Sequence, residues 1–183
     1  MSKKILIVVD MQNDFIYDSL GSPEARAIVP NVVAKVQQYK NEGNMVLYTM
    51  DTHNRAYLDT QEGKKLPVPH CIEFTYGWEI IPELKAVDSN IEAQKDDPFG
   101  CVIKKESFGS IEWPFRLPYM VEEIEIVGVC TDICVVSNAL MIKPYRPRTE
   151  IIVDASCCAG TCPAAHKAAL QTMKSCQITV IGE

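Results

Sequence analysis

The sequence predicts an α/β fold: a doubly wound, mostly parallel sheet of six strands with helices on both faces. Two observations lead to this prediction. Short apolar runs rich in Val and Ile recur along the chain, and segments with helical spacing of apolar residues lie between them. Runs of this length without polar alternation are typical of parallel strands that are covered on both faces. Strand and helix therefore alternate, as they do in doubly wound sheets.

The individual elements follow from local signals. In residues 31–42, Val32, Val33 and Val36 recur at helical spacing, and Gly43 follows as a typical helix end. A second helix is predicted over residues 164–174, because Pro163 is favoured as a first helical residue. The six predicted strands are 5–9, 45–50, 101–103, 123–129, 150–153 and 178–181.

Composition narrows the class of protein. A chain of 183 residues with 47% hydrophobic content fits one domain spanning residues 1–183. The formal net charge is -6 and no basic cluster exceeds pairs such as Lys64 and Lys65, so a nucleic-acid partner is not expected. The apolar stretch 5–9 is far too short for a membrane span and no cleavage pattern follows it. We therefore expect a cytoplasmic protein whose eight cysteines are reduced thiols.

Polar residues follow the predicted strands. In open α/β sheets, ligands bind beyond the carboxyl ends of the strands, so these residues are expected to converge. In chain order they are Asp10, Asp51, Lys104 with Lys105, the turn 130–134, and Asp154.

Cys134 is the strongest candidate for a nucleophile. It follows a strand and a turn and falls in the first turn of a predicted helix, where the helix N-terminus lowers a thiol pKa and free N–H groups can hold an oxyanion. A lone cysteine is more often a small buried hydrophobe. The interpretation therefore depends on Asp10, which can take the thiol proton, and on Lys105, which can stabilise the thiolate.

A second constellation lies in the long, weakly periodic stretch 52–78 and just before it. Asp51, His53 and His70 offer a carboxylate and two imidazoles, which suit zinc, iron or manganese. Taken alone, such spacing also arises by chance in ordinary loops. Long loops in compact domains are usually functional or disordered, and the Asp, His and Pro content here favours function.

Five short motifs occur in the order found in one family: IVVDMQNDF at 7–15, DTH at 51–53, HC at 70–71, KESFG at 105–109 and GVCTDIC at 128–134. The chain resembles the isochorismatase-like, or nicotinamidase-like, superfamily of cysteine hydrolases over nearly its whole length. Residues 154–156 and 163–173 also resemble the last strand–helix unit of that family.

The resemblance implies a Rossmann-like sheet and a catalytic triad of Asp10, Lys105 and Cys134. It assigns the oxyanion hole to the backbone N–H groups of Cys130 and Cys134, and it implies a cis peptide bond between Val129 and Cys130. Lys104 is the alternative to Lys105, because adjacent strand residues point to opposite faces. Lys105 is preferred because family members commonly place this lysine three residues before an aromatic, here Phe108.

The resemblance also implies the ligands and the substrate. It assigns a divalent metal, zinc first with iron or manganese as alternatives, to Asp51, His53 and His70. It assigns substrate contacts to Phe15 and Val129, and the metal favours nicotinamide over isochorismate as substrate. Two departures weaken the choice of substrate: Pro67 stands where many nicotinamidases have tryptophan, with Trp78 as a doubtful replacement, and residues 73–76 lack the usual Gly-Thr.

Four alternatives stay open. The enzyme can act on another small carboxamide or carbamoyl compound, or the chain can be a noncatalytic or metal-binding scaffold. Cys71 can be a ligand or a packed thiol, and a second zinc site at Cys157, Cys158, Cys162 and His166 is weakly indicated because no second ligand pair is present. A small-molecule amide is the expected partner, and the family resemblance also implies a homo-oligomer.

Overall fold

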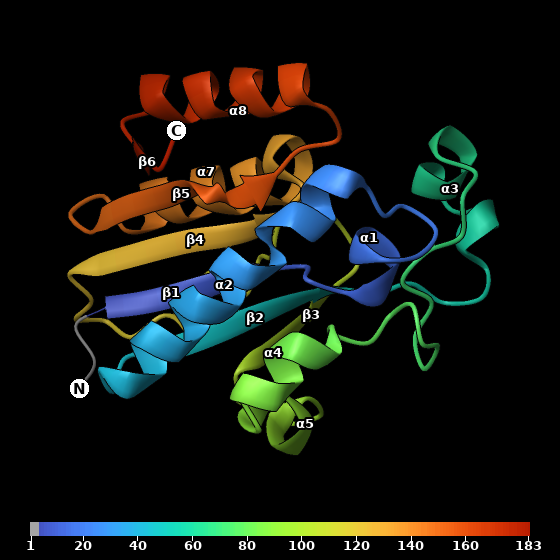
Figure 1. Ribbon diagram of the computed structural model, residues 1–183, viewed down its shortest axis with the longest axis horizontal. Coiled ribbons are helices and arrows are strands. Elements are labelled where there is room, and N and C mark those ends of the chain that lie inside the picture. Colours follow the sequence, from blue (N-terminus) through green and yellow to red (C-terminus); the bar gives the residue numbers. More distant parts are fainter. Residues whose placement is uncertain (1–3) are drawn as a thin grey trace.

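A computed structural model describes residues 4–183 and contains a six-stranded sheet in the order β3-β2-β1-β4-β5-β6, in which every neighbouring pair is parallel (Figure 1). The predicted doubly wound α/β fold is confirmed. The strands are β1 (Lys4–Val9), β2 (Met45–Asp51), β3 (Val102–Lys105), β4 (Glu123–Val129), β5 (Glu150–Ala159) and β6 (Thr179–Ile181).

The predicted end of the fifth strand is wrong. Strand β5 continues past Asp154 to Ala159, because the ladder with β4 resumes after a register shift, with Cys158 opposite Gly128 and Ala159 opposite Val129. Asp154 therefore lies within the strand, where its Oδ2 is 2.8 Å from Nζ of Lys35. The same ammonium group lies 2.7 Å from Oε1 of the buried Glu125 in β4.

The first long helix begins earlier than predicted. Helix α2 spans Pro23–Asn41, because Ser22 accepts a hydrogen bond from the Ala25 N–H and Pro23 occupies the first helical position. Pro30 lies inside this helix. Helix α8 (Pro163–Ser175) agrees with the prediction. The shorter helices are α1 (Asn13–Ile16), η1 (Tyr57–Asp59), α3 (Gln61–Lys65), α4 (Pro82–Val87), α5 (Asn90–Gln94), α6 (Trp113–Arg116), the π-helical turn η2 (Thr131–Val135) and α7 (Val136–Tyr145).

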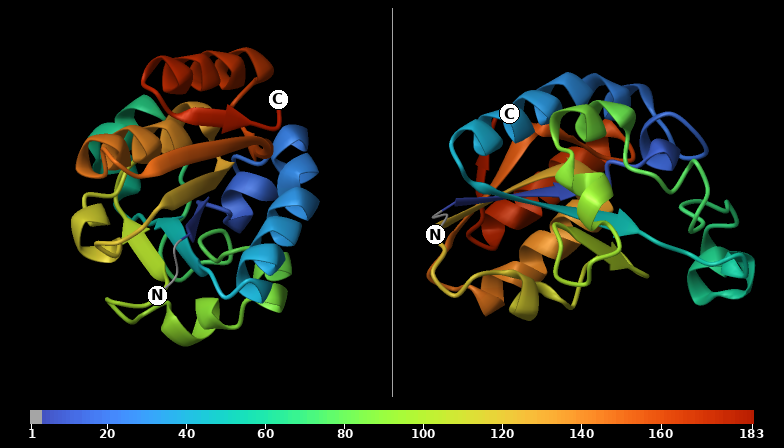
Figure 2. Two further views of the ribbon diagram at one scale, coloured as in Figure 1. Left: turned by 90° about the vertical axis from the view of Figure 1, so that its left-hand side faces the viewer. Right: turned by 90° about the horizontal axis from the view of Figure 1, so that it is seen from below.

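Each face of the sheet has its own apolar core. In β1, Leu6 and Val8 face the side covered by α2, α4 and α5, whereas Ile5, Ile7 and Val9 face the side covered by α6, α7 and α8. Figure 2 shows the two helical layers on either side of the strands. Because β1 is buried on both faces, its run of aliphatic residues shows no polar alternation.

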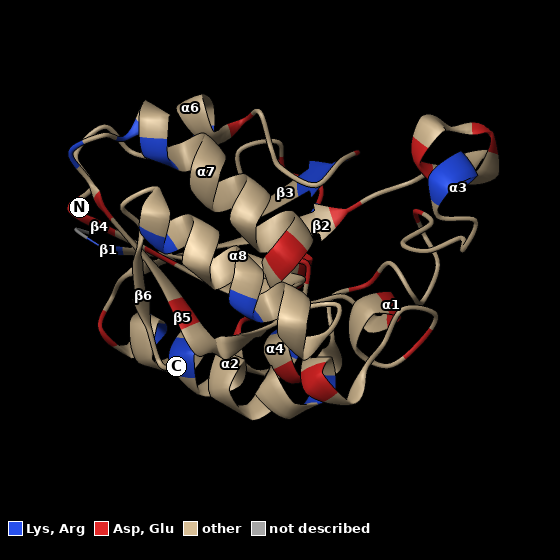
Figure 3. Ribbon diagram, turned by 90° about the horizontal axis from the view of Figure 1, so that it is seen from above, with Lys and Arg blue, Asp and Glu red and all other residues tan. Residues whose placement is uncertain are grey.

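The segment that follows β2 extends beyond the carboxyl ends of the strands (Figure 1). It contains η1 and α3, and Tyr57 of η1 is buried. In the view of Figure 3, lysines and arginines are scattered over several elements among the acidic residues, with no continuous basic stripe.

Two further sequence predictions can be compared with the described residues. None of the helices within residues 4–183 is long and apolar enough to cross a membrane. All eight cysteines lie in this part of the chain and are free thiols, as predicted.

Candidate active site

Asp10, Lys105 and Cys134 lie together at the carboxyl edge of the sheet. Asp10 follows β1 with a φ of 50°, a left-handed conformation that Asp adopts more readily than most residues. Its Oδ2 lies 2.7 Å from Nζ of Lys105, the last residue of β3, and its Oδ1 accepts a 2.6 Å hydrogen bond from the Thr49 hydroxyl. Both charged side chains are almost completely buried.

Cys134 reaches this pair from the turn that follows β4. It lies in η2, where the carbonyl of Cys130 accepts hydrogen bonds from the N–H groups of Ile133 and Val135. Nζ of Lys105 donates to the Cys134 sulfur over 3.7 Å. The peptide bond between Val129 and Cys130 is cis, as the family resemblance implied.

The electrostatics of this group are dominated by burial. Burial raises the pKa of the Cys134 thiol well above its ordinary value, and the Asp10 carboxylate raises it further while Lys105 opposes the shift. Burial also raises the pKa of Asp10 against the opposing effect of Lys105. Although burial lowers the pKa of Lys105, attraction to Asp10, Cys134 and Asp51 raises it overall. These shifts favour an uncharged thiol and a charged Lys105 ammonium, and they make the Asp10 carboxylate easier to protonate than an ordinary aspartate.

A cluster of potential metal ligands lies next to this group. The Nε2 atom of His53 lies 3.0 Å from Oδ2 of Asp51, and Nε2 of His70 lies 3.4 Å from the same oxygen. Oε1 of Glu62 lies 3.8 Å from both Nε2 atoms. All four side chains offer a ligand atom within 4.8 Å of one another, and among residues 4–183 no other group of this kind was found.

Glu62 is the member of this cluster that the sequence analysis missed. It lies in α3, nine residues after His53, and no ligand spacing connects it to the Asp-x-His motif. The sequence signal available here was Thr60, a residue type that often caps helices and so predicts a helix containing Glu62. In the structure Thr60 accepts a hydrogen bond from the Gly63 N–H at the start of α3. The alternatives left open for the cysteines are also resolved in part: neither Cys71 nor the group around Cys157 belongs to a ligand cluster within the described residues.

Buried hydrogen bonds hold these ligands in place. His70 Nδ1 donates to the Val68 carbonyl over 2.8 Å, which leaves Nε2 facing the cluster as the nitrogen available for coordination. Gln12 binds both backbone groups of Asp51, through Nε2 to the carbonyl and Oε1 to the N–H. Although burial disfavours ionisation, hydrogen bonds from His53 and His70 hold the pKa of Asp51 well below its usual range.

Between the two groups lies a cavity of about 340 Å³. Cys134 lines it together with Asp51, Glu62 and His70 of the ligand cluster. Phe15 and Val129, the two predicted substrate-contacting residues, also line it. Most of its other lining is apolar: Leu20, Ala25, Leu66, Phe108, Cys130, Ile133 and Ala159.

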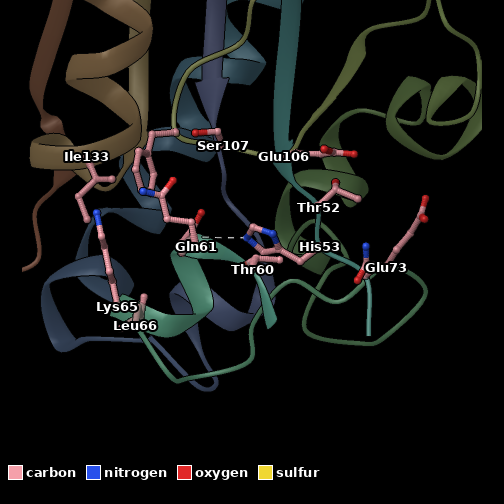
Figure 4. A pocket seen from close by; sticks show the side chains of 13 residues that line it. Thr52, His53, Thr60, Gln61, Lys65, Leu66, Glu73, Glu106, Ser107 and Ile133 are labelled. Atoms are coloured by element: carbon pink, nitrogen blue, oxygen red, sulfur yellow. Dashed lines mark ion pairs between the residues drawn. The ribbon is translucent and has the colours of Figure 1, made fainter. Parts of the chain in front are cut away.

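A wider groove of about 670 Å³ lies on the other side of the ligand cluster. Figure 4 shows His53 between Thr52 and Thr60 in this groove, with Lys65 extended towards Ile133. Glu62, Leu66, Phe108 and Ile133 line both this groove and the inner cavity, so they form the boundary between them.

Three residues that the sequence analysis considered for the site lie outside it. Lys104 points away from Asp10 and pairs with Glu73 and Asp96. Asp154 does not join the site, because it pairs with Lys35 from within β5. Trp78 does not line the inner cavity and so does not stand in for the missing tryptophan; its ring N–H donates to the Thr52 hydroxyl.

Comparisons with known proteins identify the family of this chain. Residues 4–182 match the isochorismatase domain model. A nicotinamidase of Saccharomyces cerevisiae is 24% identical, with 82% of this chain and 86% of that protein covered. The crystal structure of nicotinamidase/pyrazinamidase PncA from Bacillus subtilis gives a TM-score of 0.82 at 27% identity, with 98% and 99% of the two chains covered. Pyrazinamidase of Pyrococcus horikoshii in complex with zinc gives 0.79 at 27% identity, covering 99% of each chain.

The chain therefore belongs to the isochorismatase family, whose members include cysteine hydrolases. Within that family it is a nicotinamidase-like amidohydrolase.

Proposed function

We propose that this enzyme is a metal-assisted cysteine amidohydrolase that converts nicotinamide to nicotinic acid and ammonia. The observation that carries the proposal is the inner cavity, which is lined both by Cys134, next to the buried Asp10–Lys105 pair, and by the potential metal ligands Asp51, Glu62 and His70. A ring amide can present its carboxamide to Cys134 while its ring contacts the Phe15 wall.

The first half of the reaction begins at the thiol. Asp10 takes the proton of Cys134, and its raised pKa makes it a stronger base than an ordinary aspartate. Lys105 stabilises the thiolate as it forms, because its ammonium group lies 3.7 Å from the sulfur. The thiolate then attacks the carboxamide carbon, and the backbone N–H groups of Cys130 and Cys134 are proposed to hold the resulting oxyanion.

The second half returns the enzyme to its resting state. Asp10 gives its proton to the departing nitrogen, the carbon–nitrogen bond breaks, and ammonia leaves while a thioester to Cys134 remains. Asp10 next takes a proton from water, and the hydroxide attacks the thioester carbonyl. Cleavage of the carbon–sulfur bond releases nicotinic acid and a thiolate, which recovers its proton from Asp10.

The ligand cluster fits a divalent cation. Asp51, Glu62, His53 and His70 supply two oxygens and two imidazole nitrogens, a set that suits zinc, with iron and manganese as alternatives. The metal would supply a Lewis-acidic site for the ring nitrogen of the substrate. The related Pyrococcus horikoshii structure in complex with zinc supports this choice.

A second candidate function is hydrolysis of another small carboxamide or carbamoyl compound. Pro67 and the exposed Phe74 occur where the chain departs from the nicotinamidase pattern, and the apolar cavity wall contains no tryptophan. A panel of amides assayed beside nicotinamide separates the two functions by their ratios of kcat/KM.

One experiment tests reaction, substrate and metal together: ammonia release from nicotinamide by metal-free protein, by zinc-, iron- and manganese-loaded protein, and by Cys134→Ala. We expect activity that depends on metal and is abolished in Cys134→Ala. Normal ammonia release by Cys134→Ala refutes the mechanism, whereas turnover of a different amide in the panel replaces nicotinamide as substrate. Turnover of no amide at all, with no thiol-directed labelling at Cys134, supports a noncatalytic scaffold instead.

We also propose that residues 1–183 act as one domain, in a cytoplasmic homo-oligomer. Light scattering of the purified protein tests the oligomer, and fractionation of the source cells tests the location.

A further inference from the structure

Asn138 connects the turn that carries Cys134 with the segment that carries Phe108. It lies in α7, one helical turn after Cys134, and is completely buried. Its Nδ2 group donates to the Cys134 carbonyl over 2.8 Å and to the Phe108 carbonyl over 3.2 Å. Its Oδ1 accepts from the Ser110 N–H over 3.0 Å and from the Trp113 ring N–H over 2.9 Å.

These four bonds use the whole hydrogen-bonding capacity of a side-chain amide, which has two hydrogens to donate and one oxygen with two lone pairs. An amide is needed because the site offers two carbonyls and two N–H groups at once. A hydroxyl has only one hydrogen, and a carboxylate has none when ionised. The chemistry of the site is therefore specific for this side chain.

The segment held by Asn138 contributes Phe108 to the boundary between the inner cavity and the outer groove. Residues 106–112 connect Lys105 at the end of β3 with α6, and Phe108 lines both the inner cavity and the outer groove. The same segment lies tightly against α7 at Gly109, where an added Cβ would be 2.4 Å from the Met141 sulfur. Asn138 thus fixes Phe108 on the same framework that holds the nucleophile.

We propose that Asn138 is a positioning residue that sets the distance between the Phe108 wall and Cys134, and thereby determines how tightly the enzyme holds the ring of its amide substrate. The inference rests on the proposed amide hydrolysis. Because Asn138 touches backbone and Trp113 but does not line the cavity, it acts through Phe108 and Cys134.

Asn138→Thr is chosen to keep a hydrogen bond to the Cys134 carbonyl and to remove the one to the Phe108 carbonyl. From this helical position, a threonine hydroxyl can donate to the carbonyl four residues earlier, which is that of Cys134. That hydrogen is then not available to Phe108, so the cavity wall is released while the bond to the Cys134 turn is kept. Ile142→Ala is the matched control, because it lies one turn further along α7 and removes a buried side chain from the core.

The test measures kcat and KM for the amide that the wild type hydrolyses best. We expect Asn138→Thr to raise KM about tenfold with kcat within about threefold, as loss of hydrogen bonds at one wall would do. Ile142→Ala should leave KM unchanged when both variants are assayed as folded protein. An unchanged KM in Asn138→Thr, or an equal rise in Ile142→Ala, overturns the inference.

A second measurement does not depend on turnover: protection of Cys134 from iodoacetamide by nicotinamide. The concentration that gives half protection should rise about tenfold in Asn138→Thr, while the unprotected alkylation rate stays within about twofold. If nicotinamide protects Cys134 in a wild-type protein that hydrolyses no amide, the proposed function is refuted. The comparison of half-protection concentrations still tests the role of Asn138. A half-protection concentration equal to that of the wild type overturns the inference, as does a wild type that no amide protects.

Discussion

Replacement of Lys105 by methionine removes the cation that faces the nucleophile, and its effect can be worked from the geometry. With 3.7 Å between Nζ and the Cys134 sulfur and an effective dielectric constant of about 20, the ammonium stabilises a thiolate by about 4.5 kcal/mol. We therefore expect Lys105→Met to lower kcat/KM by about a thousandfold. The assay is ammonia release from nicotinamide at fixed metal loading.

The neighbouring lysine provides a matched control. Lys104 makes its ion pairs with Glu73 and Asp96 at the surface, so Lys104→Met should change kcat/KM by less than about threefold and stability by less than about 1 kcal/mol. Lys105→Met leaves the buried carboxylate of Asp10 without its partner, which is expected to lower the free energy of unfolding by about 3 to 5 kcal/mol. Urea unfolding and circular dichroism must therefore show that this variant is folded before its activity is compared. A larger loss in Lys104→Met than in Lys105→Met refutes the reasoning.

Three further outcomes are expected. Glu62→Gln should weaken zinc binding about 10- to 100-fold in a chelator competition while Glu73→Gln does not, and equal affinities would remove Glu62 from the ligand set. Lys35→Met should lower the free energy of unfolding in urea by about 3 kcal/mol, against less than about 1 kcal/mol for the exposed Lys174→Met, because Lys35 lies between two buried carboxylates. Since thiolate is the reactive form and the pKa of Cys134 is raised, its alkylation rate should reach half-maximum at a pH above that of N-acetylcysteine; a lower midpoint contradicts the assigned electrostatics.

Much of the sheet could be predicted because its strands are buried on both faces. The aliphatic run of β1 ends at a carboxylate, and the predicted strand 5–9 differs from the observed strand by one residue. In β5 the rule that a polar residue ends a buried strand failed at Asp154. The reason lies in the tertiary structure, because Lys35 from α2 pairs with that carboxylate inside the sheet. A local sequence pattern cannot predict a partner 119 residues away in the chain.

The residues of the candidate site also fall into those that the sequence predicts and those that depend on tertiary structure. Asp51 and Lys105 end strands, and Asp10 and Cys134 follow strands, so parallel topology alone brings them to one edge. The choice of Lys105 over Lys104 came from the family motif, and the opposite directions of the two side chains agree with it. Glu62 and Asn138 lie in helices, and their partners are defined only once α3 and α7 are folded against the strand ends.

Asp51 joins the two halves of the site, and the charges around it favour a cation. Its Oδ1 lies 3.3 Å from Nζ of Lys105, and its Oδ2 faces both imidazoles. The buried ammonium group of Lys105 thus pairs with Asp10 and Asp51 and also acts on the charge of Glu62, so three carboxylates surround it. Burial raises the pKa of Glu62, and the nearby negative charge of Asp51 raises it further. A divalent cation would balance the two excess charges, so metal removal should lower thermal stability as well as activity; an apo-protein that melts at the same temperature as the zinc-loaded protein at saturating zinc would contradict this balance.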